Sequence, residues 1–380
     1  MKADRLMKVT AGVLIVGTLA ACSGTSIEAT STPQPTEPER PPTHLPTDAP
    51  TATTQPTNVP TTVPESPTAT QETLATETLE PAPLVTPVSE GKFILFSRNI
   101  HGNYDLFRLN LVTKAEENLT NTDDADEMNA QVSPDGSWAV FYGDHVTNDN
   151  PGGKNVLWKI DLKNNNNVSA LTKGIDADGN IIDQHWYDPT ISPDGKTIAC
   201  KLDKGDENEN GKIYLMDSDG ENIRELLLKD EKGDLIHGEM WKPAFNADGT
   251  KIYITVGTRD DSEIYVVNSD GSNATRLTNN DNSDWYAAPN PTNKDEIAIT
   301  SNESGHDQIY LMDSDGNIVQ QLTDQPNDVD DPSWSPDGKQ ITAVENDGNQ
   351  YDVIVIDRNG ANLKNITNTP NKELSPAFIQ

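Results

Sequence analysis

Acidic and aromatic side chains recur directly before a series of apolar segments in this chain. Aromatic rings and carboxylates together suit the binding of sugars, of cations or of a basic segment of a partner protein. The residues that we expect to form such a ligand-binding site are His185, Trp186, Tyr187, Asp188, Glu239, Trp241, Asp284, Trp285, Asp330 and Asp331. The alternative is that the tryptophans pack in the core while the carboxylates only solvate the loops.

A second set of side chains carries the oxygen atoms that calcium prefers as ligands. Asp176, Asp178, Asn180 and Asp183 lie close together in a polar segment. The repeated Asp-x-Asp-Gly sequences, such as residues 313–316, lack the further ligands of a calcium loop, so we expect them to be tight turns. Calcium at the first four residues is the only cofactor that the sequence suggests.

Histidine and cysteine residues offer few candidates for chemistry. His101, His145 and His306 are predicted to lie in exposed hairpin turns, and no group of Cys and His residues has the spacing of a zinc site. Cys200 follows two apolar residues in a predicted strand. We therefore expect it to be a small buried apolar residue rather than a reactive thiol.

One phrase repeats through the part of the chain that must position these side chains. Residues 332–338 read Pro-Ser-Trp-Ser-Pro-Asp-Gly, and related segments begin at residues 130, 189, 243 and 287. A truncated copy begins at Pro376, and the last three intervals between copies are 44, 45 and 44 residues. This period is in the range of one four-stranded propeller blade.

Within each repeat, short strand signals alternate with turn signals. In residues 308–316, Gln-Ile-Tyr-Leu-Met runs into Asp-Ser-Asp-Gly, which supplies the positive φ of a tight hairpin. The repeat that begins at Phe93 lacks its opening strand, whereas residues 374–379 are an opening strand without the other three. We therefore predict an all-β fold, a six-bladed β-propeller of four-stranded antiparallel blades, closed by the C-terminal strand joining the first blade.

The repeat resembles the TolB-type propeller repeat, also called WD40-like or PD40, over nearly all of Phe93 to Gln380. The resemblance implies a scaffold for protein complexes, although TolB has an extra N-terminal α/β domain that this sequence lacks. Some similar propellers are metal-dependent pectate-fragment lyases with a histidine-rich channel site, a position that only His185 and His237 approach here. Others are joined to serine peptidases, a class that the absent Gly-x-Ser-x-Gly motif excludes.

The N-terminal part of the chain has the features of an export and anchoring segment. Residues 1–21 combine basic residues with a short apolar run, and Leu-Ala-Ala-Cys at residues 19–22 resembles a bacterial lipobox, in which Cys22 becomes lipidated. The alternative is an ordinary cleaved signal peptide. Residues 22–88 are rich in Thr and Pro and predict a disordered stalk, and residues 89–380 form the propeller.

The charge and the domain order suggest a function class. The chain has 61 Asp and Glu against 28 Lys and Arg, a net charge of −33, which argues against nucleic acid as a partner. We expect a monomeric, non-catalytic binding propeller, lipid-anchored at the extracytoplasmic face of a bacterial cell membrane, that recognises a protein or cell-wall glycan at the channel mouth. The alternative is a metal-dependent enzyme acting on polysaccharide.

Overall fold

The computed structural model describes residues 93–205 and 211–379. The predicted signal peptide, Cys22 and the stalk lie outside the described residues. Every described residue belongs to the unit Glu80–Gln380. Within this described part, no helix has the length and apolar character needed to cross a membrane.

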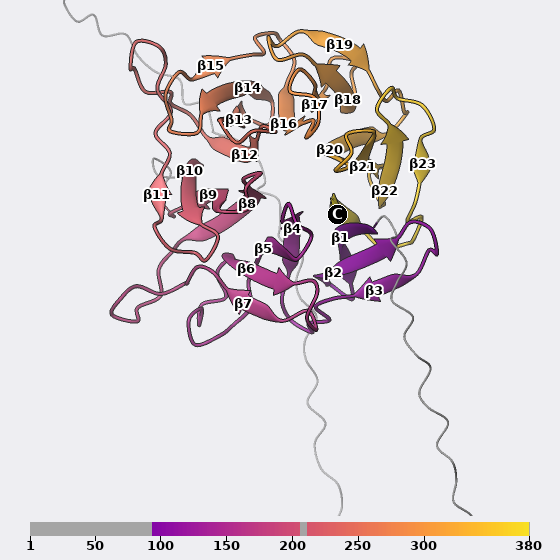
Figure 1. The fold of residues 1–380 in the computed structure, drawn as a ribbon. Coiled ribbons are helices and arrows are strands. Elements are labelled where there is room, and N and C mark those ends of the chain that lie inside the picture. The colour runs from indigo at the N-terminus through magenta and orange to yellow at the C-terminus, as the bar shows by residue number, and fades with distance from the viewer. Residues whose placement is uncertain (1–92, 206–210, 380) are drawn as a thin grey trace, which may run out of the picture. The chain divides into compact units, whose positions relative to one another are not determined.

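Six four-stranded antiparallel sheets form a closed ring (Figure 1). The first three blades are made of β24 (Glu373–Ile379), β1 (Phe93–Ile100), β2 (Asn103–Asn110) and β3 (Glu116–Asn118); β4 (Glu127–Val132), β5 (Trp138–Gly143), β6 (Val156–Asp161) and β7 (Val168–Ala170); and β8 (His185–Ile191), β9 (Thr197–Asp203), β10 (Lys212–Asp217) and β11 (Arg224–Glu225).

The next three blades continue the ring in chain order. They are made of β12 (Met240–Phe245), β13 (Lys251–Thr258), β14 (Asp261–Asn268) and β15 (Thr275–Arg276); β16 (Asp284–Pro289), β17 (Ile297–Ser301), β18 (Gln308–Met312) and β19 (Ile318–Gln321); and β20 (Asp328–Trp334), β21 (Gln340–Asn346), β22 (Tyr351–Asp357) and β23 (Lys364–Asn365). The first-named strand of each blade lies nearest the centre of the ring (Figure 1).

The C-terminal strand closes the ring as predicted. β24 pairs antiparallel with β1, with Phe93 opposite Ile379 and Arg98 opposite Glu373. The buried side chains of Arg98 and Glu373 also form an ion pair, with Nε 2.8 Å from Oε1. The predicted six-bladed fold and its closure are therefore confirmed.

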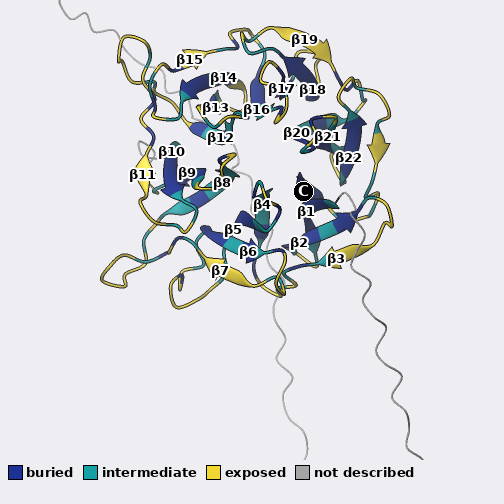
Figure 2. Ribbon diagram, viewed as in Figure 1, coloured by how far each residue is buried: buried dark blue, intermediate teal, exposed yellow. Residues whose placement is uncertain are grey.

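The core lies between the blades, because each sheet packs both of its faces against its neighbours. The middle strands are consequently almost continuous apolar runs, and every residue of β17 and of β18 is buried. The outermost strands are mostly exposed, and β19 is exposed throughout (Figure 2). This distribution explains why the second and third strands of each repeat have the most continuous apolar sequences.

The repeated motifs hold the blades together locally. The Thr of each Leu-Thr pair accepts a hydrogen bond from a third-strand backbone N–H; Thr323 Oγ1, for example, lies 2.9 Å from the Ile309 nitrogen. Gly316, which ends an Asp-x-Asp-Gly turn at φ 92°, packs so closely on the preceding blade that a Cβ would lie 2.4 Å from the Leu277 carbonyl oxygen. These motifs therefore serve the fold.

Two predictions about single residues have opposite outcomes. Cys200 is fully buried, as expected, and burial raises the pKa of its thiol. His145 is not an exposed turn residue: its side chain is only 17% exposed and its ring lies 4.6 Å from that of Trp158. The expectation for His145 is wrong because the hairpin after β5 folds back over a buried carboxylate.

Candidate functional site

Every innermost strand contains one extra residue at the same place. In the fourth blade, Trp241 lies opposite Thr255 while Ala244 lies opposite Tyr253, so three steps along β12 match two along β13. The same register shift occurs in the other five blades. Such a β-bulge changes the direction of the side chains that follow it.

The bulge residue has a positive φ in all six blades, although none of the six is glycine. The six residues and their φ values are Asn129 (52°), Asp188 (49°), Lys242 (48°), Tyr286 (54°), Asp331 (55°) and Ser375 (52°). This conformation costs non-glycine residues on the order of 1–3 kcal/mol each, and such strain is concentrated at functional sites. We call these six residues the bulge ring.

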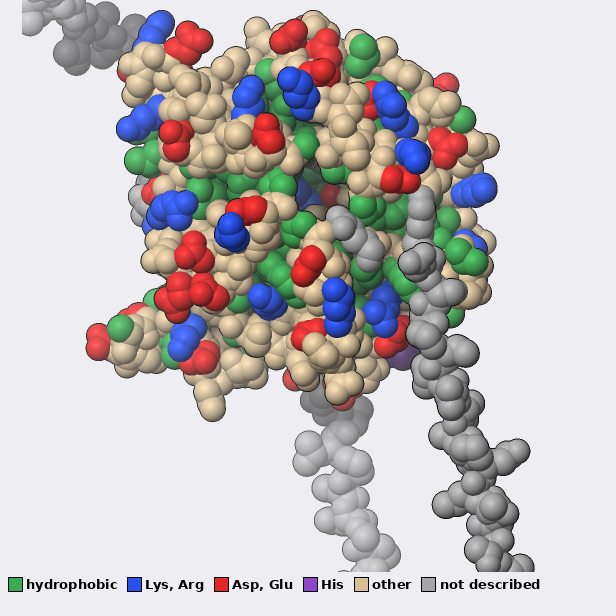
Figure 3. All heavy atoms as spheres, in the orientation of Figure 1, with side chains coloured by type: hydrophobic (Ala, Val, Ile, Leu, Met, Phe, Trp, Pro, Cys, Tyr) green, Lys and Arg blue, Asp and Glu red, His purple; other side chains and the backbone are tan. Residues whose placement is uncertain are grey.

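The bulge ring lines a cavity of about 220 Å³ at the centre of the propeller. The space-filling view shows hydrophobic side chains around the central hollow and charged side chains over the surrounding face (Figure 3). Because the ring takes one residue from each blade, its composition is set blade by blade. It combines two carboxylates, one ammonium group, one phenol, one amide and one hydroxyl group.

Polar contacts connect the members of the bulge ring across the channel. Asn129 Nδ2 donates to Asp188 Oδ1 at 2.7 Å, and Ser375 Oγ donates to Asn129 Oδ1. Lys242 Nζ donates to Asp331 Oδ1 at 3.2 Å and lies 3.8 Å from Asp188 Oδ1. Burial alone would lower the pKa of Lys242, but these two carboxylates raise it above its usual value.

A second cavity, of about 290 Å³, shares Asp188 and Tyr286 with the bulge ring. We call it the mouth cavity. Its wall is aromatic, since the rings of Trp241 and Tyr286 meet edge to face at 5.7 Å and those of Trp285 and Tyr286 at 6.5 Å. The lining residues are Asp188, Lys201, Glu239, Trp241, Gly257, Arg259, Trp285, Tyr286 and Asp330.

The cations at the mouth cavity have carboxylate partners. Lys201 Nζ lies 2.9 Å from Glu239 Oε1 and 3.3 Å from Asp203 Oδ2. Arg259, at the tip of the hairpin between β13 and β14, lies 4.0 Å from Asp307 Oδ2 and 5.9 Å from the centre of the Trp285 ring. The cavity is thus rich in charge, but most of this charge is neutralised locally.

Asp330 is the exception among the charged side chains that line the mouth cavity. Its carboxylate forms no hydrogen bond or ion pair with any of the residues that the structure describes. Burial, and then the neighbouring Asp331 and Asp307, raise the pKa of Asp330 to about 7. The pKa of Asp307 is raised to about 6, chiefly by burial and also by Asp328.

Not all of the predicted site residues reach the channel. Seven of them line the two cavities or flank them, namely Tyr187, Asp188, Glu239, Trp241, Trp285, Asp330 and Asp331. Trp186 is 4% exposed and packs edge-on against Tyr214 in the core, and Asp284 is 1% exposed and accepts a hydrogen bond from Asn280. The expectation that these two face the mouth is not met, because residues two before the bulge point into the blade junctions.

His185 begins β8 and lies beside the mouth rather than in it. Its ring stacks on Tyr187 at 6.1 Å, and its side chain is 30% exposed. Burial and the nearby Lys154 lower the pKa of His185. His237, the other histidine that precedes an opening strand, is exposed in the loop before β12.

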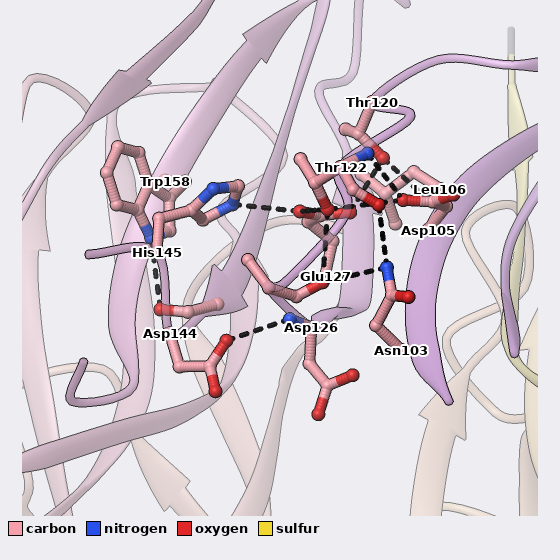
Figure 4. A network of polar contacts seen from close by, with 12 residues as sticks. Asn103, Asp105, Leu106, Thr120, Thr122, Asp126, Glu127, Asp144, His145 and Trp158 are labelled. Carbon is pink, nitrogen blue, oxygen red and sulfur yellow. Dashed lines mark hydrogen bonds and ion pairs between the residues drawn. The ribbon is translucent and has the colours of Figure 1, made fainter. Parts of the chain in front are cut away.

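Glu127 shows what an acid two residues before the bulge does (Figure 4). Its carboxylate accepts hydrogen bonds from Thr120 and Thr122 at 2.7 and 2.8 Å, and His145 Nε2 lies 3.0 Å away. The threonines follow β3 and the histidine follows β5, so Glu127 joins the first blade to the second. Its burial raises its pKa. This position is structural.

The structure adds residues to the site that the sequence interpretation missed. Asn129, Lys242, Tyr286 and Ser375 could have been found, since each directly precedes the Pro or Ala that opens a copy of the phrase. Lys201 and Arg259 had no such signal. They come from the end of the second strand in one blade and from a hairpin tip in the next.

The predicted calcium ligands form a turn of their own. Asp176 Oδ1 accepts hydrogen bonds from the backbone N–H groups of Asp178 and Asn180, both at 2.9 Å, and Asp183 pairs with Lys154 at 2.6 Å. In the part of the chain that the structure describes, no three His, Cys, Asp or Glu side chains are grouped to hold a metal ion. Calcium binding at these residues stays a prediction.

The geometry defines a class of protein: a closed six-bladed β-propeller with a polar, aromatic-walled central channel. Residues 231–379 match the family model described as the TolB beta propeller domain (PD40). Over these residues the chain matches the TolB-type propeller repeat, as its motifs predicted. A search of the curated proteins found no sequence match.

Solved structures share this fold at low sequence identity. TolB from Acinetobacter baumannii is 19% identical, with a TM-score of 0.57 over 76% of this chain and 66% of that one. A putative TolB from Agrobacterium tumefaciens is 19% identical, with a TM-score of 0.55 over 72% and 88%. A chain of the nidogen/laminin complex is 11% identical, with a TM-score of 0.56 over 76% and 99%. Thus the chain spans slightly less than two thirds of the Acinetobacter TolB.

Proposed function

We propose that this protein is a non-catalytic binding propeller that recognises a protein or cell-envelope ligand through the mouth cavity. The observation that carries this proposal is the mouth cavity itself, in which Trp241, Trp285 and Tyr286 form a wall beside the Asp330 carboxylate, which has no partner among the described residues. Buried aromatic anchors surrounded by charge are typical of interaction sites. The likeness to TolB and to a chain from a protein complex agrees with this role.

The alternative, a metal-dependent enzyme acting on polysaccharide, would need several metal ligands in the channel. The ligand groups at the bulge ring are instead engaged with one another, since Asp188 and Asp331 both face the ammonium group of Lys242. This arrangement favours binding over metal-assisted catalysis.

Partner capture by the full chain tests the proposal. Trp241→Ala should weaken capture at least about tenfold, because a half-buried aromatic anchor is lost from the mouth cavity. Trp138→Ala is the matched control, since Trp138 is also half-buried but begins β5, at the end of the strand away from the mouth. Equal capture by both variants, each with an unchanged circular dichroism spectrum, would contradict the proposal.

We also propose that the propeller is tethered to the extracytoplasmic face of a cell membrane through a lipid on Cys22. The support is the sequence of residues 19–22 and the basic and apolar segment before them. Cys22→Ser should move the protein to the soluble fraction or block its processing. Cys200→Ser is the matched control and should leave membrane association unchanged; membrane association of a Cys22→Ser protein whose signal segment has been removed would disprove the tether.

A further inference from the structure

The charges around the channel indicate what kind of ligand the mouth cavity accepts. Lys201 is paired with Glu239 and Asp203, Lys242 with Asp331 and Asp188, and Arg259 contacts Asp307. Asp330 lines the same cavity and has no partner among the described residues. Among the side chains that line the cavity, the carboxylates of Asp188, Glu239 and Asp330 stand against the cations of Lys201 and Arg259, so the surplus is one negative charge beside an aromatic wall.

The bulge ring already holds a cation in similar surroundings. Lys242 Nζ lies between the carboxylates of Asp331 and Asp188, and 4.5 Å from the centre of the Tyr286 ring. A cation gains both from the carboxylates and from the negative face of the ring when water is excluded. The mouth cavity has a similar arrangement. Asp330 takes the place of the two carboxylates, and the rings of Trp241 and Trp285 take the place of the Tyr286 ring.

We propose that the mouth cavity binds a guanidinium or primary ammonium group on an apolar stem, with the Asp330 carboxylate as its counter-ion and the rings of Trp241 and Trp285 against its stem. The inference rests on the proposed function and names the ligand chemistry. A Lys or Arg side chain of a partner protein and a free polyamine both present this group.

Arg259 is the residue that competes with such a ligand. Its side chain is 74% exposed, and its guanidinium group already lies over the Trp285 ring while its contact with Asp307 is a long 4.0 Å. An entering cation therefore meets a like charge at the edge of the cavity. Arg259→Gln removes this repulsion and should strengthen binding of a cation.

Binding should depend on pH in a definite direction. The charged groups that face Asp330 are Asp331 on its own strand, Asp307, Lys242 and Arg259. Because the pKa of Asp330 is raised to about 7, its carboxyl group is mostly protonated at pH 6 and mostly ionised at pH 8. A guanidinium ligand stays charged over this range, so its affinity should rise about tenfold from pH 6 to pH 8.

Calorimetric titration of the full chain with Nα-acetylarginine amide tests the proposal, with Nα-acetylcitrulline amide as the neutral analogue of the same shape. We expect the arginine probe to bind at least about tenfold more tightly than the citrulline probe at pH 8. Asp330→Asn should abolish this preference. Asp315→Asn changes the net charge equally at an exposed turn and should keep it.

Each outcome decides the question. Equal affinity for the two probes, a preference that survives Asp330→Asn, or weaker arginine binding by Arg259→Gln would overturn the inference. Tight binding of spermidine together with no detectable binding of the arginine probe would support the cation chemistry and assign it to a free polyamine. If no cation binds while partner capture still depends on Trp241, this inference fails and the proposed function stands.

Discussion

The mouth cavity and the outer hairpin turns differ in how they use carboxylates. In the turn that contains Asp313, its carboxylate accepts hydrogen bonds from the Asn317 side chain at 2.9 Å and from the backbone N–H groups of Asn317 and Asp315 at 2.9 and 3.0 Å, and these bonds lower the pKa of Asp313. In the mouth cavity, Asp330 is partly buried without a partner among the described residues, and its pKa is raised. Hydrogen bonds within the repeated turn therefore satisfy the Asp313 carboxylate, whereas the Asp330 carboxylate has no hydrogen bond or ion pair with the described residues.

The same contrast is seen in how far the blades resemble one another. Four of the six blades carry Asp-x-Asp-Gly or a close variant at this turn, because they share the same hairpin and the same close approach to the preceding blade; the turns are residues 217–220, 268–271, 313–316 and 357–360. The bulge ring has five residue types in six blades. Repetition in this chain therefore marks the fold, and variation at an equivalent position marks the candidate site.

The largest effect should come from opening the ring. Ending the chain at Lys372 removes β24 and exposes the unpaired edge of β1, so we expect a fall in melting temperature of more than about 10 °C or loss of folding. Deleting residues 51–58, a segment of equal length outside the propeller, is the control and should have little effect. A truncated protein that melts within a degree or two of the parent would show that closure by β24 contributes little.

Lys242→Met should be the most destabilising single substitution at the bulge ring. It leaves the partly buried carboxylates of Asp188 and Asp331 without their shared cation, which should cost about 3 kcal/mol in the free energy of unfolding. Lys339→Met is the control, because that side chain is 76% exposed and its ion pair is at the surface. Similar urea midpoints for the two variants would contradict a stabilising role for the network.

Asp330→Asn should instead stabilise the protein, and only at higher pH. The pKa of Asp330 is about 7 in the folded state and near its ordinary value of 3.8 when unfolded, so the folded state holds the extra proton between about pH 4 and 7. Stability of the parent therefore falls as pH rises through this window. The variant should lack that fall and gain roughly 2–4 kcal/mol at pH 8.

Denaturant titrations of parent and variant at pH 4, 6 and 8 check this prediction. Asp315→Asn is the matched control and should follow the parent at every pH. A constant difference between Asp330→Asn and the parent across the three pH values would mean that the Asp330 carboxyl group titrates normally.

The smallest effect should come from an outer turn. Asp313→Ala removes hydrogen bonds to backbone N–H groups that water can replace, so we expect a fall in melting temperature of about 1–2 °C and unchanged partner capture. A loss of capture with this variant would place recognition on the outer turns and remove the distinction between the two regions.

The architecture was predictable from the sequence because its signals are local. The Asp-Gly turns, the short apolar strands and the 44- or 45-residue period are each contained in one stretch of chain, and the incomplete repeats at Phe93 and Pro376 complement each other. The pairing of these two incomplete repeats into one blade can be inferred without knowing any side-chain contact. Blade number and closure therefore followed from counting repeats.

The site was only half predictable, because a bulge decides which residues face the channel. Strict alternation along a strand would separate Tyr187 and Asp188, but the extra residue in β8 brings both toward the centre and leaves Trp186 in the core. The pairing of Lys242 with Asp331 joins residues 89 positions apart in different blades. The sequence alone determined the blades and their order, while the tertiary structure decided which charges meet, because burial and pairing depend on contacts across the ring.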